Sequence, residues 1–387
     1  MSERPISERG AERRAERTAE VDPEGLLEYS VVFTDRSLNH MSQAFQAVMR
    51  DISGTLRQVY NAASVAVVPG GGSYGMESVA RQFATGKKVL VIRNGFFSYR
   101  WSQIFEMGAI PAEEIVMKAR MVSDQPQAPF APPPIDEVVA RIRGEKPDLV
   151  FAPHVETAAG LLLPDDYLQA VAAAVHEHGG LFVLDCIASG TLWVDMAANG
   201  VDILISAPQK GWSSSPCSAL VMFGEEAAKR LEQTQSTSFA MDLLKWRRIM
   251  EAYENGGHAY HATMPTDALR KFRDAMLETR DAGFEAVREK QWELGRRVRE
   301  LFAERGLASV AAPGFEAPGV VVCYTEDDGM HNGSKFIAKG LQTAAGVPLM
   351  CDEPAGFKTF RVGLFGLDKL GDVDRAVRRL AEALDNI

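Results

Sequence analysis

Two residues with complementary chemistry, Asp185 and Lys210, each follow a short apolar segment of the 387-residue chain. Leu181 to Leu184 is apolar and ends at the aspartate, and Val201 to Ile205 is apolar and leads through a Ser-Ala-Pro-Gln turn to the lysine. Short apolar runs bounded by Gly, Pro and Ser are typical of buried parallel strands, whose ends hold ligands in α/β proteins. The sequence therefore predicts a carboxylate and an amine at the ends of two neighbouring strands.

An aspartate and a lysine in this arrangement suit pyridoxal phosphate. The lysine amine can form a Schiff base with the aldehyde of that cofactor, and a carboxylate beside the pyridine nitrogen keeps it protonated, so that the ring accepts electrons. Each residue alone has a commoner explanation, because an Asp after a strand often caps a turn and a loop Lys is usually solvated. The pair in this context favours the cofactor.

Asp185 and the Gln209-Lys210 pair resemble the motifs of the class V (fold type I) pyridoxal-phosphate aminotransferases, in particular the alanine–glyoxylate and serine–glyoxylate group. The resemblance covers roughly residues 60 to 370, with further motifs in the order of the family. It implies an α/β protein with a mostly parallel seven-stranded sheet domain that binds the cofactor and a small α+β C-terminal domain.

The glycine run that ends in Gly72-Ser73-Tyr74 lies between a predicted strand and a predicted helix. Glycines at such a turn let backbone N–H groups close around a phosphate at the positive end of the helix. By the family match, Gly72, Ser73 and Tyr74 would bind the cofactor phosphate. Gln209 matches a family position that also contacts this phosphate.

Three further residues match positions beside the cofactor ring. Phe97 follows Asn94 in an Asn-Gly-x-aromatic pattern and would stack on the pyridine face; the alternative is an ordinary core residue. Ile187 follows Asp185 closely and would lie against the other face. Thr157, in a His-x-Glu-Thr run, would lie near the ring oxygen and the aspartate, while the histidine and glutamate of that run would orient the loop.

The substrate residues come from two segments. In the resembled family the arginine of an Arg-Ile-Gly motif pairs with the substrate carboxylate, and Arg361 of Arg-Val-Gly takes this role, for which a planar guanidinium is well suited. Arg36 occupies a turn that departs from the family's Pro-Gly-Pro; it either contacts an anionic substrate group or is solvated. The Cys351-Asp352-Glu353 loop replaces a glycine-rich loop, and its acidic pair either selects a substrate with a positive or hydrogen-bond-donating side chain or points to solvent.

Tyr260 and Thr263 match a Tyr-x-x-Thr segment that, in the family, reaches the phosphate of the neighbouring subunit. The resemblance therefore implies a homodimer with shared active sites. A loop before a helix capped by Thr266 is compatible with this role and with a purely structural one.

Hydrophobic periodicity predicts the elements that hold these residues. Apolar runs predict strands at 63–68, 87–93, 147–153, 181–184, 201–205 and 219–223, an edge strand at 112–122 and a short extended segment at 28–33. Helical spacing predicts helices at 42–60, 135–143, 165–178, 225–234, 240–254 and 269–305, the last as two helices meeting near 282–283. Residues 125–134 are predicted to be a loop, and the C-terminal part to have strands at 319–324 and 359–362 and helices at 334–343 and 372–384. The expected division is a flexible tail (1–25) or a helix packing on a partner subunit, a large cofactor domain (26–285) and a small domain (286–387).

Composition limits the partners. With 46% apolar residues the chain can bury a large core, and a net charge of −10 argues against a nucleic-acid partner. No apolar run reaches the roughly 18 residues that a membrane span needs. Four cysteines without close pairing are typical of reduced thiols and predict a cytoplasmic protein, and the histidine spacing predicts no metal site.

The resulting prediction is an aminotransferase that moves an amino group from an amino acid to a small 2-oxo acid such as glyoxylate or pyruvate, with Lys210 as proton carrier. One alternative is a pyridoxal-phosphate lyase or cysteine desulfurase on the same fold, with Cys351 as its nucleophile, although the small-residue motif of those enzymes is missing. A non-catalytic protein that has kept the fold is the other alternative, and it would be expected to have lost Lys210, Asp185 or Arg361.

Overall fold

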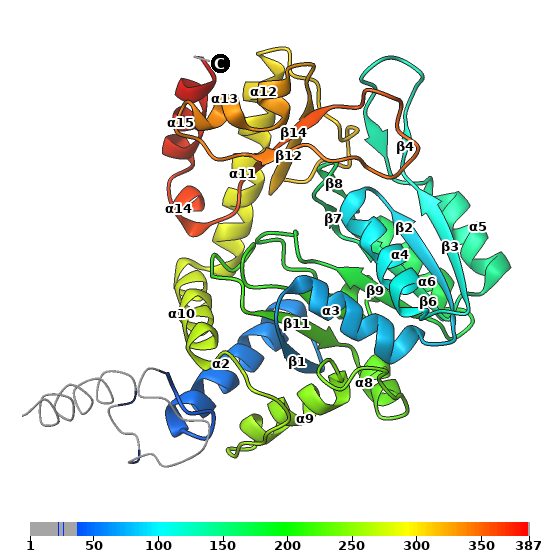
Figure 1. Cartoon of the computed structure of the whole chain (residues 1–387), viewed down its shortest axis with the longest axis vertical. Coiled ribbons are helices and arrows are strands. Elements are labelled where there is room, and N and C mark those ends of the chain that lie inside the picture. The colour runs from blue at the N-terminus through cyan, green and yellow to red at the C-terminus, as the bar shows by residue number, and fades with distance from the viewer. Residues whose placement is uncertain (1–21, 23–25, 27–36, 386–387) are drawn as a thin grey trace, which may run out of the picture.

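The computed structural model describes Asp22, Leu26 and residues 37–385 (Figure 1). Most of the expected tail at 1–25, the extended segment at 28–33 and Arg36 therefore lie outside the described residues. In the described part of the chain, no helix is long and apolar enough to cross a membrane.

A seven-stranded sheet with the order β1-β11-β10-β9-β6-β2-β3 organises the larger part of the molecule. Its strands are β1 (Ser64–Pro69), β2 (Lys88–Arg93), β3 (Glu113–Lys118), β6 (Leu149–Pro153), β9 (Leu181–Asp185), β10 (Ile203–Ser206) and β11 (Ser218–Phe223). Only β11 runs antiparallel to its neighbours, β1 and β10, and the other pairs are parallel. The prediction of a mostly parallel sheet is confirmed, with β3 at its edge.

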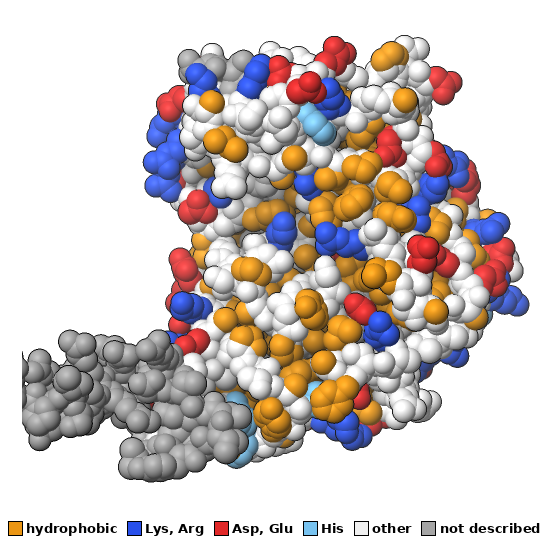
Figure 2. All heavy atoms as spheres, viewed as in Figure 1, with side chains coloured by type: hydrophobic (Ala, Val, Ile, Leu, Met, Phe, Trp, Pro, Cys, Tyr) orange, Lys and Arg blue, Asp and Glu red, His pale blue; other side chains and the backbone are white. Residues whose placement is uncertain are grey.

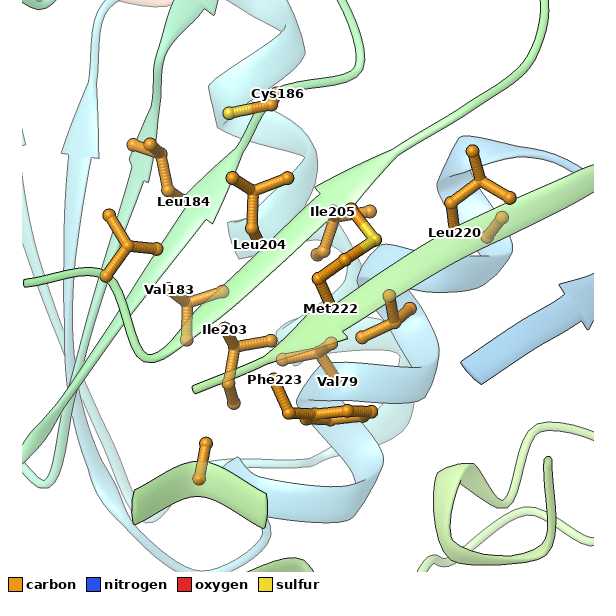
Figure 3. Packing of buried hydrophobic residues seen from close by; sticks show 14 of the residues in the cluster. Val79, Val183, Leu184, Cys186, Ile203, Leu204, Ile205, Leu220, Met222 and Phe223 are labelled. Carbon is orange, nitrogen blue, oxygen red and sulfur yellow. The ribbon is translucent and has the colours of Figure 1, made fainter. Parts of the chain in front are cut away.

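The centre of this sheet is a continuous apolar layer. Every residue of β6, β9, β10 and β11 is buried, as expected for strands covered on both faces. Figure 3 shows side chains of β9, β10 and β11, such as Leu184, Leu204 and Met222, packing together beside Val79 of the helix α3 (Gly72–Val79). This rigid layer fixes where the strands end, and so where Asp185 lies.

Helices and short turns connect the strands, as the predicted alternation of elements requires. Beside α3, which continues as a π-helical turn (Ala80–Ala84), they are α2 (Gln43–Tyr60), α4 (Phe96–Gly108), α5 (Ile135–Glu145), α6 (Asp165–His176), α7 (Met196–Asn199), α8 (Glu225–Leu231), α9 (Leu243–Glu254) and α10 (Thr266–Ala282). The side chains of Ser42 and Asp242 cap α2 and α9 by accepting from backbone N–H groups of the first turn.

A second, antiparallel sheet with the order β12-β14-β13 lies in the C-terminal part (Figure 1). It consists of β12 (Val320–Tyr324), β13 (Ala344–Ala345) and β14 (Thr359–Gly363), accompanied by α11 (Phe284–Ala303), α12 (Asp328–His331), α13 (Ser334–Ile337), α14 (Leu367–Leu370) and α15 (Val373–Leu384). A buried cluster joins α11, β12, β14 and α15. The domain boundary at 285/286 stays a prediction.

Three local expectations differ from the structure or are refined by it. The helix expected at 334–343 ends at Ile337, and Gly340 follows with a φ of 76°. The edge strand ends at Lys118, after which β4 (Arg120–Met121) pairs with β5 (Phe130–Ala131) inside the predicted loop. A further small pair joins β7 (Val155–Glu156) and β8 (Leu161–Leu162). The expected break in the long helical segment is confirmed at Gly283, where φ is 88°.

Candidate active site

Asp185 and Lys210 lie at the ends of two neighbouring parallel strands. Asp185 is the last residue of β9 and is the register partner of Ile205 in β10, and Lys210 follows β10 after a short turn. Both residues line the same cavity, which has a volume of about 200 Å3. The predicted meeting of carboxylate and amine is confirmed.

The Asp185 carboxylate is buried and has no ion pair within the described part of the chain. Its Oδ1 accepts a hydrogen bond from the backbone N–H of Ile187 at 2.9 Å. Burial raises the pKa of Asp185 to about 7, against the smaller opposing effect of this hydrogen bond. A positively charged neighbour such as a protonated pyridine would stabilise the ionised carboxylate.

The Lys210 amine is set up to be a better nucleophile than a solvated lysine. Its pKa is lowered by burial and further by the positive charges of Arg361 and Arg100. The ammonium nitrogen lies 5.2 Å from the centre of the Phe365 ring. A lowered pKa increases the share of neutral amine, the form that attacks an aldehyde.

The start of α3 forms one end of the cavity. Gly72 and Ser73 line it, and a Cβ added at Gly72 would lie 2.5 Å from Cδ1 of Ile187. Gln209 also lines the cavity, and its buried Oε1 has no hydrogen-bond partner among the described residues. Tyr74 is not in the lining, because its ring packs over Gly70 and is 54% exposed.

Phe97 is held in the cavity wall by Glu156. This fully buried carboxylate accepts hydrogen bonds from the backbone N–H groups of Phe97 (3.2 Å), Ser98 (2.9 Å) and Ala158 (2.9 Å), and from the Ser98 hydroxyl (2.7 Å). It thus satisfies N–H groups at the start of α4, which have no partner within the helix. A Cβ at Gly95 would lie 2.7 Å from Cγ and Cδ of Glu156, so the close approach requires glycine.

The loop after β6 completes the wall. Thr157 lines the cavity together with Ile187. His154 shares a hydrogen bond of 2.8 Å between Nδ1 and Ser189 Oγ, and its backbone N–H donates to the Asp185 carbonyl. Burial lowers the pKa of His154 to about 3, so the ring is neutral and braces the loop that carries Asp185.

Arg361 lies beside the cavity rather than in its lining. Its Nε donates to the Ala345 carbonyl at 2.8 Å, and its guanidinium carbon lies 5.3 Å from the centre of the Phe97 ring. Arg100, which does line the cavity, was missed in the sequence motifs. The available signal was helical spacing, because Arg100 is three residues after Phe97 and therefore shares its helix face.

The acidic loop is turned away from the cavity. Asp352 pairs with Lys118 at 2.6 Å, and Glu353 accepts from the backbone N–H groups of Leu349, Met350 and Cys351. Neither carboxylate lines the cavity. Cys351 is buried, with its Sγ 3.3 Å from the Arg93 carbonyl oxygen, and also lies outside the lining.

Tyr260 and Thr263 also lie outside the lining. Their hydroxyl oxygens are 3.4 Å apart, and the Tyr260 side chain is 58% exposed. Their contact with a partner's phosphate stays a prediction.

Among the described residues, no group of three or more His, Cys, Asp or Glu side chains could hold a metal ion.

The donor set fits pyridoxal phosphate. Asp185 offers a buried carboxylate without a cationic partner in residues 37–385, and Lys210 offers an amine with a lowered pKa. Gln209 lines the same cavity, and its side-chain amide carries N–H donors that suit a phosphate. Aromatic Phe97 and aliphatic Ile187 supply apolar surfaces for a ring.

The chain is similar in sequence to known aminotransferases. No protein-family model matches the chain. It is 25% identical over 371 residues to the alanine–glyoxylate aminotransferase of Oryctolagus cuniculus, a match that spans 90% of this chain and 87% of the relative. It is 29% identical over 236 residues to the 2-aminoethylphosphonate–pyruvate transaminase of Burkholderia ambifaria, spanning 60% of this chain and 61% of the relative, less than two thirds of that protein.

Solved structures share the fold. The alanine–glyoxylate aminotransferase from Nostoc sp. superposes with a TM-score of 0.71 at 21% identity, covering 90% of this chain and 89% of the other. The ureidoglycine–glyoxylate aminotransferase from Bacillus subtilis gives 0.71 at 20% identity, covering 90% and 87%. These structures show that the chain has the fold of the type I aminotransferases, and the relatives in sequence to which it is similar are aminotransferases as well.

Proposed function

We propose that this protein transfers an amino group from an amino acid to a small 2-oxo acid, with glyoxylate or pyruvate as acceptor. The observation that carries the proposal is the meeting of Asp185 and Lys210 in one cavity at the ends of β9 and β10. Relatives named as alanine–glyoxylate and 2-aminoethylphosphonate–pyruvate aminotransferases support these acceptors.

Bound pyridoxal phosphate would supply an electron sink for the substrate's Cα–H bond. Lys210 would hold the cofactor through its amine and, once released, carry a proton to and from the substrate Cα. Asp185 would hold the proton on the pyridine nitrogen, and Arg361 would bind the substrate carboxylate through its planar guanidinium. Gly72, Ser73 and Gln209 would bind the phosphate, and Phe97, Ile187 and Thr157 would enclose the ring. Tyr74 would contact the phosphate only if its ring moved from its present position over Gly70.

We further propose a homodimer whose partner subunit receives Tyr260 and Thr263 at its phosphate site. Exposed aromatic side chains support this assembly, since Tyr74, Phe239 and Tyr260 are 54%, 77% and 58% exposed. Figure 2 shows hydrophobic side chains gathered across the centre of the face on which α3 lies in Figure 1.

The free cysteines Cys186, Cys217, Cys323 and Cys351 support a cytoplasmic location.

The lyase and desulfurase alternative has less support. A desulfurase cysteine must reach the substrate as a thiolate. Cys351 is buried outside the cavity lining, and burial raises its pKa to about 12. A neutral, enclosed thiol does not suit a nucleophile.

The deciding experiment mixes the cofactor-loaded protein with each common amino acid and follows the absorbance change from the aldehyde form to the amine form of the cofactor. Conversion by a few amino acids is expected, and Lys210→Ala should abolish it. Lys245→Ala, in α9, is the matched control and should convert normally. Sulfide or pyruvate release from cysteine without conversion would favour the lyase, and failure to take up the cofactor would refute both.

A further inference from the structure

Arg100 is a charged residue of the cavity lining to which the motifs give no role. Its Nη1 donates to Ser73 Oγ at 3.2 Å, and its guanidinium carbon lies 4.8 Å from the centre of the Phe97 ring. Within residues 37–385 it makes no other hydrogen bond and no ion pair. Because a guanidinium carries five N–H donors, most of its donors are not used by these residues.

Several other arginines among the described residues pair with a carboxylate. Arg143 pairs with Glu177 at 2.6 Å, and Arg297 pairs with Asp374 at 2.6 Å, both near the surface. Arg100 instead lies in the wall of a cavity without a carboxylate partner among residues 37–385. An unpaired guanidinium facing a binding site is an attractive site for an anion.

Two guanidinium groups approach the same volume. The guanidinium carbons of Arg100 and Arg361 lie 4.8 and 5.3 Å from the centre of the Phe97 ring, and both positive charges act on Lys210. Asp185 is the carboxylate of the lining. Before the cofactor phosphate is counted, the cavity and its rim therefore hold two guanidinium charges against the single carboxylate of Asp185.

We propose that Arg100, anchored by Ser73, is a second oxyanion-binding residue of this site, and that the preferred amino donors are dicarboxylic amino acids. Arg361 then binds the carboxylate next to the reacting carbon and Arg100 binds the distal one. This inference rests on the proposed function and names its substrate class. The acidic loop does not oppose it, because Asp352 and Glu353 are turned away from the cavity.

The cofactor phosphate offers the same oxyanion chemistry beside Ser73, so the experiment must separate the two sources. Isothermal calorimetry on the cofactor-loaded protein compares the unreactive dicarboxylate succinate with the monocarboxylate propionate. The wild type should bind succinate more tightly than propionate. Arg100→Gln should weaken the binding of succinate about tenfold, the usual scale for a lost charge-assisted hydrogen bond. The affinity for propionate should stay unchanged.

Three variants serve as comparisons. Arg361→Gln should weaken both ligands, because each presents a carboxylate to it. Arg100→Lys keeps the charge without the planar fork and should fall between wild type and Arg100→Gln. Arg143→Gln, a surface arginine, should change neither ligand.

A kinetic measurement completes the test. In the half-reaction, Arg100→Gln should reduce the second-order rate constant about tenfold for aspartate and glutamate while alanine stays within about twofold. An equal loss for all donors, or no loss, would overturn the inference. A weaker cofactor dissociation constant with unchanged discrimination would assign Arg100 to the phosphate and also overturn it. Calorimetry needs no turnover, so a protein that discriminates succinate but converts no amino acid would refute the proposed function alone.

Discussion

The ammonium nitrogen of Lys210 lies 5.2 Å from the centre of the Phe365 ring, which links the end of the large sheet to the loop after β14. Gly319 leaves room for the ring, since a Cβ there would lie 2.9 Å from it. An aromatic face attracts a cation at this distance and so favours the protonated lysine. Phe365 thus opposes the burial and the two arginine charges that lower the pKa of Lys210.

Replacing Phe365 by Leu should therefore lower the pKa of Lys210 further. The measurement is the pH dependence of the rate at which cofactor-free protein captures pyridoxal phosphate, because only the neutral amine attacks the aldehyde. The midpoint should move to lower pH in Phe365→Leu, stay in Phe365→Tyr, and move to higher pH in Arg361→Gln. A midpoint that does not move in Phe365→Leu would show that the ring has no such effect.

The buried carboxylate of Asp185 should make the cofactor-free protein less stable as the pH rises. Its pKa is about 7 in the folded protein against 3.8 as the ordinary value, so its favourable contribution is complete below about pH 4 and is lost through about pH 7. At about 1.4 kcal/mol per pH unit, the loss approaches about 4 kcal/mol. Urea unfolding of wild type and Asp185→Asn across this range should show the wild type falling relative to the variant. A constant difference between the two would contradict the shifted pKa.

The contact between Gly72 and Ile187 should control cofactor affinity. A methyl group at Gly72 would push Ile187 towards the cavity, because the added Cβ lies 2.5 Å from Cδ1. Gly72→Ala is expected to weaken the binding of pyridoxal phosphate about tenfold, which corresponds to a modest free-energy cost of overpacking. Gly71→Ala is the matched control, because a Cβ there has nothing within 4 Å. Equilibrium titration of cofactor-free protein tests both, and equal affinities would exclude the steric argument.

Glu156 should stabilise the fold as well as hold Phe97. In Glu156→Gln the amide group cannot accept all the N–H groups that the carboxylate accepts, and buried donors left unpaired cost about 1 to 3 kcal/mol of unfolding free energy. Glu177→Gln, which removes an exposed partner of Arg143, should cost less than about 1 kcal/mol. Urea unfolding at one pH compares the two, and a smaller loss for Glu156→Gln would argue against its role at the start of α4.

The shared active site predicts complementation between inactive chains. A subunit with Lys210→Ala has intact Tyr260 and Thr263, and a subunit with Tyr260→Ala and Thr263→Ala has an intact lysine. Mixed dimers should contain one site with all three residues, so unfolding and refolding the two variants together should restore up to about one quarter of wild-type activity. Sedimentation would establish the dimer independently. Failure to restore activity in mixed dimers would place Tyr260 and Thr263 outside the partner's site.

The strands of the main sheet and the meeting of Asp185 and Lys210 at one edge could be predicted from the sequence, because a buried parallel strand is a continuous apolar run that ends at polar residues. The resemblance of the motifs to a known family predicted that Phe97 and Thr157 lie beside the same ring, and the position of Ile187 two residues after Asp185 predicted that it lies there too. These are local patterns, and parallel pairing brings their ends together.

The set of charges that share the cavity could not be predicted from the sequence. Arg100 lines the cavity because it lies on one face of α4, and Glu156 of β7 contacts the start of that helix. Phe365 approaches Lys210 from the loop after β14, and Asp352 pairs with Lys118. Such contacts join residues far apart in the chain, and their geometry depends on how helices and sheets pack rather than on any local spacing.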